Sequence, residues 1–334
     1  QKNNKKGKYE TGFVCGEEKK KETKELVFKE MELWNKSHKI KDLDVLIATP
    51  PCQGMSVANH KKNNELTRNS LVVESIKITK EIKPKFFVYE NVSAFLKTAC
   101  TDIDGEERAI GNAIELNLGG DYNIHSEIIN FKNYGNFSSR TRTIVIGVRK
   151  DQKDITPFSL FPSIQPEKNL KEAIGHLKSL KDMYEFDKND FYHSFKAYTP
   201  HMREWIKGIK EGESAFDNED PRKRPHIIVD GNIIFNAKKN GDKYTRTFWN
   251  KVAPCIHTRN DILSSQNTIH PKDDRVFSIR ELMILMSIPK NFQWIDTPLK
   301  TLNNLSNEEK IIISKKNEMN IRHSIGEAVP TIIF

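Results

Sequence analysis

The chain has few cysteines and no long apolar run. Only four of its 334 residues are cysteine, and no two of them form a CxxC pair. This scarcity argues against a disulfide framework and a cysteine-based metal site, and it favours a reducing, cytoplasmic setting. No apolar stretch approaches the roughly 20 residues needed to span a membrane, and the polar start QKNNKKGKYE lacks a signal-peptide pattern. We therefore expect neither a membrane protein nor a metalloprotein.

Acidic residues are outnumbered by basic ones. The chain has 54 Lys and Arg against 45 Asp and Glu, which gives a formal net charge of +9. A surplus of this size favours a polyanionic partner such as nucleic acid. A Lys-rich proteome would give the same surplus, so the charge alone leaves the partner open.

The first 150 residues alternate between strand-like and helix-like patterns. The apolar run DVLIAT (44–49) and the segment KFFVYENV (85–92) are typical of buried parallel strands, and a helical pattern over 68–84 separates them. The segments YNIHSEIINF and TRTIVIGVR predict a further pair of strands. Strands separated by helices indicate an α/β sheet.

The pattern changes after residue 150. From 151 to 274 no period is sustained, although HIIVDGNIIF (226–235) predicts a hairpin with Asp230 and Gly231 at its turn. Order returns over 274–292, where Ser278 and Glu281 match a capping box ahead of an apolar helix. The segment NIRHSIGEAVPTIIF at the end predicts another helix or loop.

One cysteine directly follows two prolines, in the stretch ATPPCQGMS. Cys52 comes just after DVLIAT, and in open α/β sheets the ligand crevice lies beyond the carboxyl ends of the strands. Pro50 and Pro51 restrict the backbone, while Gly54 permits a sharp turn. A lone cysteine is more often a buried structural residue. Its place on a stiff, polar corner favours a nucleophile once the next motifs are considered.

A carboxylate and two guanidinium groups accompany this thiol. Glu90, in YENV, closes the strand predicted over 85–92 and so shares a sheet edge with Cys52. Burial would raise the pKa of this carboxyl and let it donate to a ring nitrogen. Arg140 and Arg142 are two residues apart, so on a strand they share one face and suit a base oxygen, a phosphate or a carboxylate. Each pattern taken alone also fits ordinary surface residues.

Together these motifs resemble the carbon-5 cytosine DNA methyltransferases of bacterial restriction-modification systems. The resemblance rests on PPCQG, ENV, RTR, RVFSIRELMILMSIP and IGEAVP, in the family's order and across nearly the whole chain. It implies a Rossmann-like, S-adenosylmethionine-dependent methyltransferase sheet with a second, smaller and irregular domain. The catalytic domain would comprise 1–150 and 275–334, and the target-recognition domain 151–274.

The resemblance also implies a covalent mechanism. The Cys52 thiolate would add to carbon 6 of a cytosine flipped out of the duplex, while Glu90 holds or protonates ring nitrogen 3. Carbon 5 would then take the methyl group of S-adenosylmethionine. Arg142 would contact the cytosine oxygen, and Arg140 would orient Glu90. The loop that closes over the DNA would carry Ser56, Lys61 and Lys62.

Three features depart from the family pattern. In the arginine motif Ser138 stands where the family has Gln, and in the last motif Glu327 follows Gly326 where the family has Asn. The family's Phe-x-Gly-x-Gly-Gly loop is absent. A central strand cannot be omitted without exposing its neighbours, so we expect the missing segment in upstream residues or in a partner polypeptide. The cofactor contacts implied by the resemblance are Glu17 or Glu18 for the ribose hydroxyls, Pro50, Leu71 and Glu327.

The expected partners are double-stranded DNA and a cognate restriction endonuclease. Arg246, Thr258 and Arg259 lie where the family contacts DNA, and PRKRPH (221–226) is either a phosphate-binding or a solvated basic loop. Three alternatives stay open: a transfer-RNA methyltransferase of the same family, a non-catalytic DNA-binding chain without a complete cofactor site, and a thiol enzyme of the protease kind. The last ranks lowest because no histidine motif pairs with Cys52.

Overall fold

The computed structural model describes residues 21–38, 42–50, 65–236 and 242–333. The chain divides into two compact units. Unit 1 comprises Gln1–Ile129 and Thr141–Phe161, and unit 2 comprises Asn130–Arg140 and Pro162–Phe334. The chain crosses between the units at residues 129–130, 140–141 and 161–162. Each unit is described by itself.

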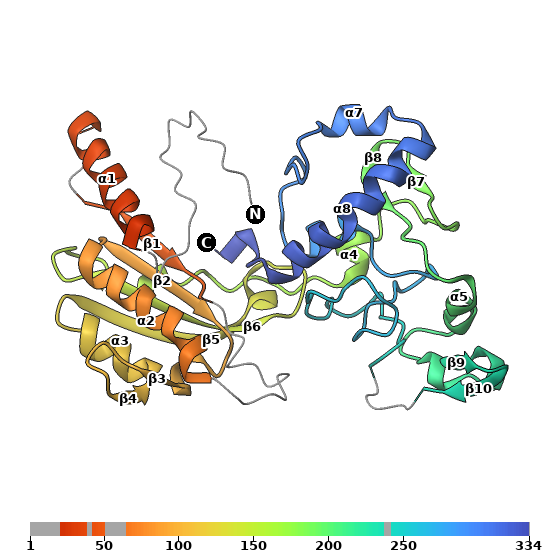
Figure 1. Cartoon of the computed structure of the whole chain (residues 1–334), viewed down its shortest axis with the longest axis horizontal. Coiled ribbons are helices and arrows are strands. Elements are labelled where there is room, and N and C mark those ends of the chain that lie inside the picture. Colours follow the sequence, from red (N-terminus) through yellow and green to blue (C-terminus); the bar gives the residue numbers. More distant parts are fainter. Residues whose placement is uncertain (1–20, 39–41, 51–64, 237–241, 334) are drawn as a thin grey trace. The chain divides into compact units, whose positions relative to one another are not determined.

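Unit 1 is built on a four-stranded mixed sheet, with the strand order β1-β2-β6-β5 (Figure 1). These strands are β1 (Val45–Ala48), β2 (Phe86–Asn91), β5 (Tyr122–Asn130) and β6 (Thr141–Arg149). β1 and β2 run parallel, whereas β2 and β6 run antiparallel. The sequence prediction of an α/β sheet is confirmed, as are the strands expected over 44–49 and 85–92 and the neighbouring pair β5 and β6.

The core of unit 1 lies between this sheet and two helices. Helix α2 (Glu65–Ile82) buries Val72 and Ile76, and helix α3 (Ile110–Leu118) buries its apolar face in the same cluster. The Phe87 ring packs straight onto the backbone of Gly147, where an added Cβ would lie 1.9 Å from the ring. Only glycine fits this position. The other elements of unit 1 are α1 (Lys21–His38), η1 (Phe95–Lys97), β3 (Ala99–Thr101), β4 (Glu107–Ala109) and η3 (Phe158–Leu160).

Strand β1 is an edge strand among the described elements, yet its sequence is VLIA. The side chains of Val45 and Ile47 point to one face and are 47% and 52% exposed. Parallel strands are normally covered on both faces and paired on both edges. β1 therefore exposes apolar surface of the kind that sheets usually bury.

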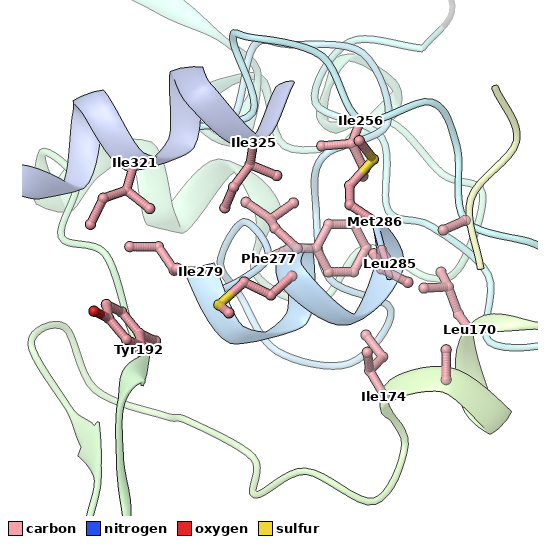
Figure 2. Close-up of a cluster of buried hydrophobic side chains, with 14 of the residues drawn as sticks. Leu170, Ile174, Tyr192, Ile256, Phe277, Ile279, Leu285, Met286, Ile321 and Ile325 are labelled. Atoms are coloured by element: carbon pink, nitrogen blue, oxygen red, sulfur yellow. The ribbon is translucent and has the colours of Figure 1, made fainter. Parts of the chain in front are cut away.

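Unit 2 holds short elements around one apolar cluster. Figure 2 shows Ile321 and Ile325 of α8 (Asn307–Glu327) beside Phe277 and Ile279 at the start of α6 (Ile279–Leu285). The remaining elements of unit 2 are η2 (Phe131–Tyr134), α4 (Leu170–Ile174), β7 (Phe186–Asp187), β8 (Asp190–Ser194), α5 (Pro200–Ile206), η4 (Ala215–Asp217), η5 (Pro221–Lys223), β9 (His226–Val229), β10 (Asn232–Phe235), α7 (Leu299–Asn303) and η6 (Thr331–Ile333).

The division into units differs from the expected grouping of residues 275–334 with 1–150. Residues 275–334 share their core with α4 and β8, through Leu170, Ile174 and Tyr192. The physical reason is that α6 and α8 turn their apolar side chains toward this cluster. The functional division into a catalytic and a target-recognition domain stays a prediction.

Two local predictions in unit 2 are confirmed. β9 and β10 form an antiparallel hairpin, and its turn residues Asp230 and Gly231 have φ angles of 50° and 78°. At the start of α6 the Ser278 hydroxyl accepts a hydrogen bond from the Glu281 amide, and the Glu281 carboxylate accepts one from the Ser278 amide. These reciprocal bonds form the expected capping box.

Glu281 also belongs to a buried ionic cluster. The fully buried guanidinium of Arg275 donates to both carboxylate oxygens of Glu281, at 2.7 and 2.8 Å, and to Asp273 at 2.8 Å. Although burial raises the pKa of Glu281, the charge of Arg275 holds it well below its usual range. Burial lowers the pKa of the neighbouring His270 to about 4, so this imidazole is neutral at physiological pH. The cluster joins the start of α6 to the loop before it.

We expect the substitution Arg275→Met to lower the free energy of unfolding by about 3–5 kcal/mol, because it leaves two buried carboxylates without their cation. Urea denaturation followed by circular dichroism measures this change. The matched control is Arg222→Met, since the Arg222–Asp220 pair is also an arginine–aspartate pair but the Arg222 side chain is 84% exposed. The control should unfold nearly as the wild type does. Equal destabilisation by both substitutions would contradict the account.

Candidate active site

The parallel pairing of β1 and β2 fixes which residues meet at one edge of the sheet. Val45 lies opposite Phe86 and Ala48 lies opposite Tyr89. The next residues of the two strands therefore place Thr49 and Pro50 beside Glu90 and Asn91. Parallel strands end at the same edge, which is where α/β sheets carry their ligand sites. Cys52 follows Pro50 by two residues and lies outside the described residues.

Asn91 ties the end of β1 to the end of β2. The side-chain amide nitrogen of this buried residue donates to the Pro50 carbonyl at 2.9 Å. Its side-chain oxygen, Oδ1, accepts a bond from the Val92 backbone amide at 2.9 Å. The Thr143 hydroxyl of β6 donates to the Val92 carbonyl at 3.1 Å. Asn91 therefore holds the backbone that leads into Cys52. Asn91 is the middle residue of the ENV motif, and the sequence alone indicated no role for it.

Glu90 and Arg142 form an ion pair at the same edge. Nε of Arg142 lies 3.0 Å from Oε1 of Glu90, and the side chains are only 17% and 7% exposed. The pairing of β2 with β6 sets Glu90 opposite Ile144, so Arg142 is its diagonal neighbour on the same face. Arg142 also donates to the Thr141 carbonyl at 2.7 Å. A buried carboxylate beside a fixed guanidinium can bind a polar ring through both a nitrogen and an oxygen.

The two arginines make different bonds. Arg142 makes the ion pair with Glu90, and the expected orientation of Glu90 by Arg140 stays a prediction. Arg140 belongs to unit 2, where its buried guanidinium donates to the carbonyls of Ile256, at 3.2 Å, and Gly326, at 3.4 Å. Arg140 directly precedes β6, which begins at Thr141.

Ser138, which stands in the arginine motif where the family has Gln, is completely buried. The amide of Asn136 donates to both its hydroxyl and its carbonyl, each at 2.9 Å. Ser138 also bridges to Ala253 in a short parallel contact. Its small hydroxyl is thus part of the packing of unit 2.

Arg246 is not available to DNA in this structure, so its prediction as a DNA contact is corrected. The side chain is 4% exposed. It donates to the carbonyls of Ile206, Ile209 and His270 at 2.8–2.9 Å and to the Asp274 carboxylate at 2.6 Å. Buried backbone carbonyls require hydrogen-bond donors, and Arg246 supplies several of them inside unit 2. Arg246 therefore has a structural role.

The other expected contacts lie at different depths. Thr258 is half-buried, and the Arg259 side chain is 60% exposed beside Asp261. Glu327 is exposed at the end of α8, with its carboxylate 3.4 Å from Nδ1 of His323. Pro50 is buried and Leu71 is half-buried on α2. The expected residues outside the described part of the chain are Glu17, Glu18, Cys52, Ser56, Lys61 and Lys62.

Comparison with known proteins adds to this geometry. The family model described as C-5 cytosine-specific DNA methylase matches residues 17–307, which is most of the chain. The chain belongs to this family. It is accordingly a DNA (cytosine-5-)-methyltransferase, as the resemblance implied, and S-adenosylmethionine is its methyl donor.

Individual relatives agree with the family match. The Type II methyltransferase M1.HgaI of Avibacterium volantium is 32% identical over 315 residues, which cover 87% of this chain and 76% of the relative. The Type II methyltransferase M.XorII of Xanthomonas oryzae is 23% identical over 275 residues, which cover 76% of this chain and 62% of the relative. A solved structure described as a DNA modification methyltransferase encoded within an E. coli prophage superposes with a TM-score of 0.55 at 19% identity, covering 90% and 79% of the two chains. This last match supports the Rossmann-like fold.

Two of the residues expected to contact S-adenosylmethionine lie in the described part of unit 1. Pro50 is a buried apolar residue whose carbonyl accepts a bond from Asn91, and Leu71 is a half-buried apolar residue on α2. Apolar surface at the carboxyl edge of a parallel pair suits an adenosine ring. No group of His, Cys, Asp and Glu in the described ranges could hold a metal ion, and no described helix is long and apolar enough to cross a membrane.

We expect Asn91→Ala to slow methyl transfer by about 100-fold, because releasing the Pro50 carbonyl lets the turn before Cys52 move away from its reactive position. Single-turnover transfer from labelled S-adenosylmethionine measures the rate. The matched control is Asn317→Ala, since this amide also donates to a backbone carbonyl, that of Ile313 at 2.8 Å, but on α8. A wild-type rate for a folded Asn91→Ala protein would contradict the assignment.

Proposed function

We propose that this chain methylates carbon 5 of a flipped cytosine in a specific duplex DNA sequence through a transient bond to Cys52. The observation that carries the proposal is the Glu90–Arg142 ion pair, which lies on the edge where Asn91 holds Pro50. A carboxyl group beside a guanidinium fits the edge of a cytosine that carries ring nitrogen 3 and the exocyclic oxygen. The proposal requires the Cys52 thiol, two residues beyond Pro50, to reach the same ring.

The proposed chemistry begins with bond formation between sulfur and carbon. The Cys52 thiolate adds to carbon 6, while Glu90 supplies a hydrogen bond or a proton to ring nitrogen 3, so that carbon 5 becomes nucleophilic. When bound, S-adenosylmethionine would supply an electrophilic methyl group to carbon 5 and leave as S-adenosylhomocysteine. A base such as water then accepts the proton of carbon 5, and the sulfur–carbon 6 bond breaks to restore the thiolate and the aromatic ring. A proton donated to nitrogen 3 returns to Glu90. Cys52 thus ends the cycle unchanged.

Arg142 would contribute in two ways. Its Nε is engaged with Glu90, which orients the carboxylate. Nη1 donates to the Thr141 carbonyl, and Nη2 would meet the exocyclic oxygen of the cytosine, where negative charge develops as sulfur adds. We therefore assign both orienting and binding roles to Arg142. Arg140 keeps an indirect role, because it holds the backbone at Ile256 and Gly326.

The target base has to leave the duplex to reach these groups. Carbon 6 is approached from the face of the ring, which stacking covers in a helix. The loop after Cys52, with Ser56, Lys61 and Lys62, is proposed to close over the DNA and exclude water. The net charge of +9 favours the approach of the polyanion.

The biological role is proposed from the relatives. M1.HgaI and M.XorII are both named Type II methyltransferases. We infer that this chain is likewise a modification enzyme, which protects DNA from a cognate restriction endonuclease.

A further strand is proposed to pair with the open edge of β1. Val45 and Ile47 are apolar and about half exposed, and β1 has one described neighbour, β2. A parallel strand followed by a covering element would bury both side chains and complete the edge beside Pro50. This strand would come from a partner polypeptide or from chain outside the described elements. It would carry the Phe-x-Gly-x-Gly-Gly loop that the resemblance implies.

Amide hydrogen exchange in an active preparation tests this pairing. We expect the β1 amides to exchange slowly, as those of β2 do, because the added strand protects them. Fast exchange at β1 in a fully active protein would contradict the added strand, without affecting the assigned chemistry.

Methyl transfer to duplex DNA tests the function itself. Labelled S-adenosylmethionine is offered with either duplex DNA or transfer RNA. We expect label in the DNA, and bisulfite sequencing should place it on a cytosine in a fixed context. Label found only in the RNA would reverse the choice of substrate in favour of the RNA-methylating branch.

We expect Cys52→Ser to abolish turnover while leaving DNA binding intact, because a hydroxyl is a far weaker nucleophile toward carbon 6. Cys255→Ser is the matched control, since Cys255 is an exposed free thiol in unit 2. It should turn over as the wild type does. Full activity of Cys52→Ser would be incompatible with the covalent route.

A further inference from the structure

A short loop of unit 2, residues 257–259, is fastened to helix α8 on both sides. After the loop, the buried amide of Asn260 donates to the Arg322 carbonyl at 2.9 Å and back to the His257 carbonyl at 2.7 Å. Arg322, which is 1% exposed, returns a bond to the Asn260 carbonyl at 3.3 Å. It also pairs with Glu318 at 2.8 Å, one helical turn earlier. The end of the loop is therefore fixed to α8 by a closed set of buried bonds.

The start of the loop is held by Arg140 and Gly326. The Arg140 guanidinium joins the carbonyl of Ile256 to that of Gly326, at 3.2 and 3.4 Å. Gly326 lies so close that an added Cβ would be 2.4 Å from the His257 carbonyl carbon and 2.5 Å from the Thr258 nitrogen. Backbone thus packs on backbone, which any other residue would prevent. We call Arg140, Asn260, Arg322 and Gly326 the loop clamp.

The clamped loop presents one charged side chain to solvent. Arg259 is 60% exposed, and its Nε lies 3.1 Å from Oδ1 of Asp261, whose side chain is 4% exposed. The buried carboxylate holds the Nε end of the guanidinium, and within the described part of the chain no bond engages its terminal nitrogens. Burial lowers the pKa of His257, so at neutral pH the positive charge of this loop is that of Arg259. Loops held rigid in this way commonly carry functional contacts.

We propose that Asp261 is a positioning residue that presets Arg259 for a backbone phosphate of the DNA, with the loop clamp fixing both. A guanidinium with two free nitrogens matches two phosphate oxygens, and the Thr258 hydroxyl beside it is a second phosphate donor. The charge is ordered before binding, so less conformational entropy is lost when DNA arrives. This assignment rests on the proposed action on duplex DNA and adds to it a contact that sets affinity and not base choice.

The salt dependence of DNA binding tests the proposal. Affinity for a labelled duplex of mixed sequence is measured over a series of salt concentrations for the wild type, Arg259→Ala, Arg259→Lys, Asp261→Ala and the double variant. We expect Arg259→Ala to weaken binding about tenfold, as for one charge-assisted hydrogen bond. The slope of log affinity against log salt should fall by about 0.9, the value for one phosphate contact.

Asp261→Ala, made alone and in the Arg259→Ala background, distinguishes a residue that positions Arg259 from one that only stabilises the fold. Asp261→Ala should weaken binding without changing the slope, because the charge still reaches the phosphate but is no longer ordered. In the Arg259→Ala background the same change should have no further effect. Arg259→Lys should keep the slope and lose part of the affinity, since an ammonium makes no paired contact. The charge-matched control is Lys300→Ala on the exposed surface of α7, which should leave affinity and slope unchanged.

Three results would overturn the proposal. One is a folded Arg259→Ala protein with wild-type affinity and slope. Another is an Asp261→Ala loss that is equal in both backgrounds, which would make Asp261 merely structural. The third is a loss confined to one base-pair context, which would indicate a base contact. Methyl transfer by the same wild-type preparation keeps the two proposals apart, because a chain that methylates DNA but shows no effect at Arg259 refutes only this contact.

Discussion

The site depends on the parallel register between β1 and β2. With Ala48 opposite Tyr89, the residues that follow must bring Pro50 next to Asn91 and leave Glu90 at the edge where Cys52 follows. A shift of one residue would turn Glu90 to the other face of the sheet. The Asn91–Pro50 bond at 2.9 Å follows from this register, and the Glu90–Arg142 pair at 3.0 Å follows from the antiparallel register of β2 and β6. The chemistry we propose therefore depends on an ordinary property of a short parallel strand pair.

Unit 2 relies on buried arginines in place of a regular sheet. Arg275, Arg246 and Arg322 are all nearly or completely inaccessible, and they bond to backbone carbonyls or carboxylates of irregular segments. A chain segment without helix or sheet leaves many carbonyls without partners, and a guanidinium can serve several at once. This explains why arginine can be abundant in a DNA methyltransferase without every arginine meeting DNA. The exposed Arg259, ordered by the buried Asp261, shows the opposite use of the same side chain.

Many of the strands, turns and caps could be predicted from the sequence. Fewer of the side-chain contacts between distant segments could be. Strands such as β1 and β2, the hairpin at Asp230-Gly231 and the cap at Ser278 follow from local patterns that need no distant partner. The site motifs were found because Cys52, Glu90 and Arg142 occur in a recognisable order. The burial of Arg246 and the partners of Arg140 depend on segments far along the chain, and the spacing of residues gives no access to them. Asn91 was overlooked because its role appears only once the register with Pro50 is known.

The central claim is that sulfur at position 52 bonds to the cytosine held by Glu90 and Arg142. Duplex DNA containing 5-fluorocytosine tests it most directly, because fluorine cannot leave carbon 5 as a proton does and the adduct cannot break down. Incubation with S-adenosylmethionine, digestion and peptide mass spectrometry then locate the modified residue. The account predicts a methylated fluorocytosine adduct on the peptide that contains Cys52. A protein that methylates ordinary cytosine but forms no adduct, or forms it on Cys255, would contradict the account.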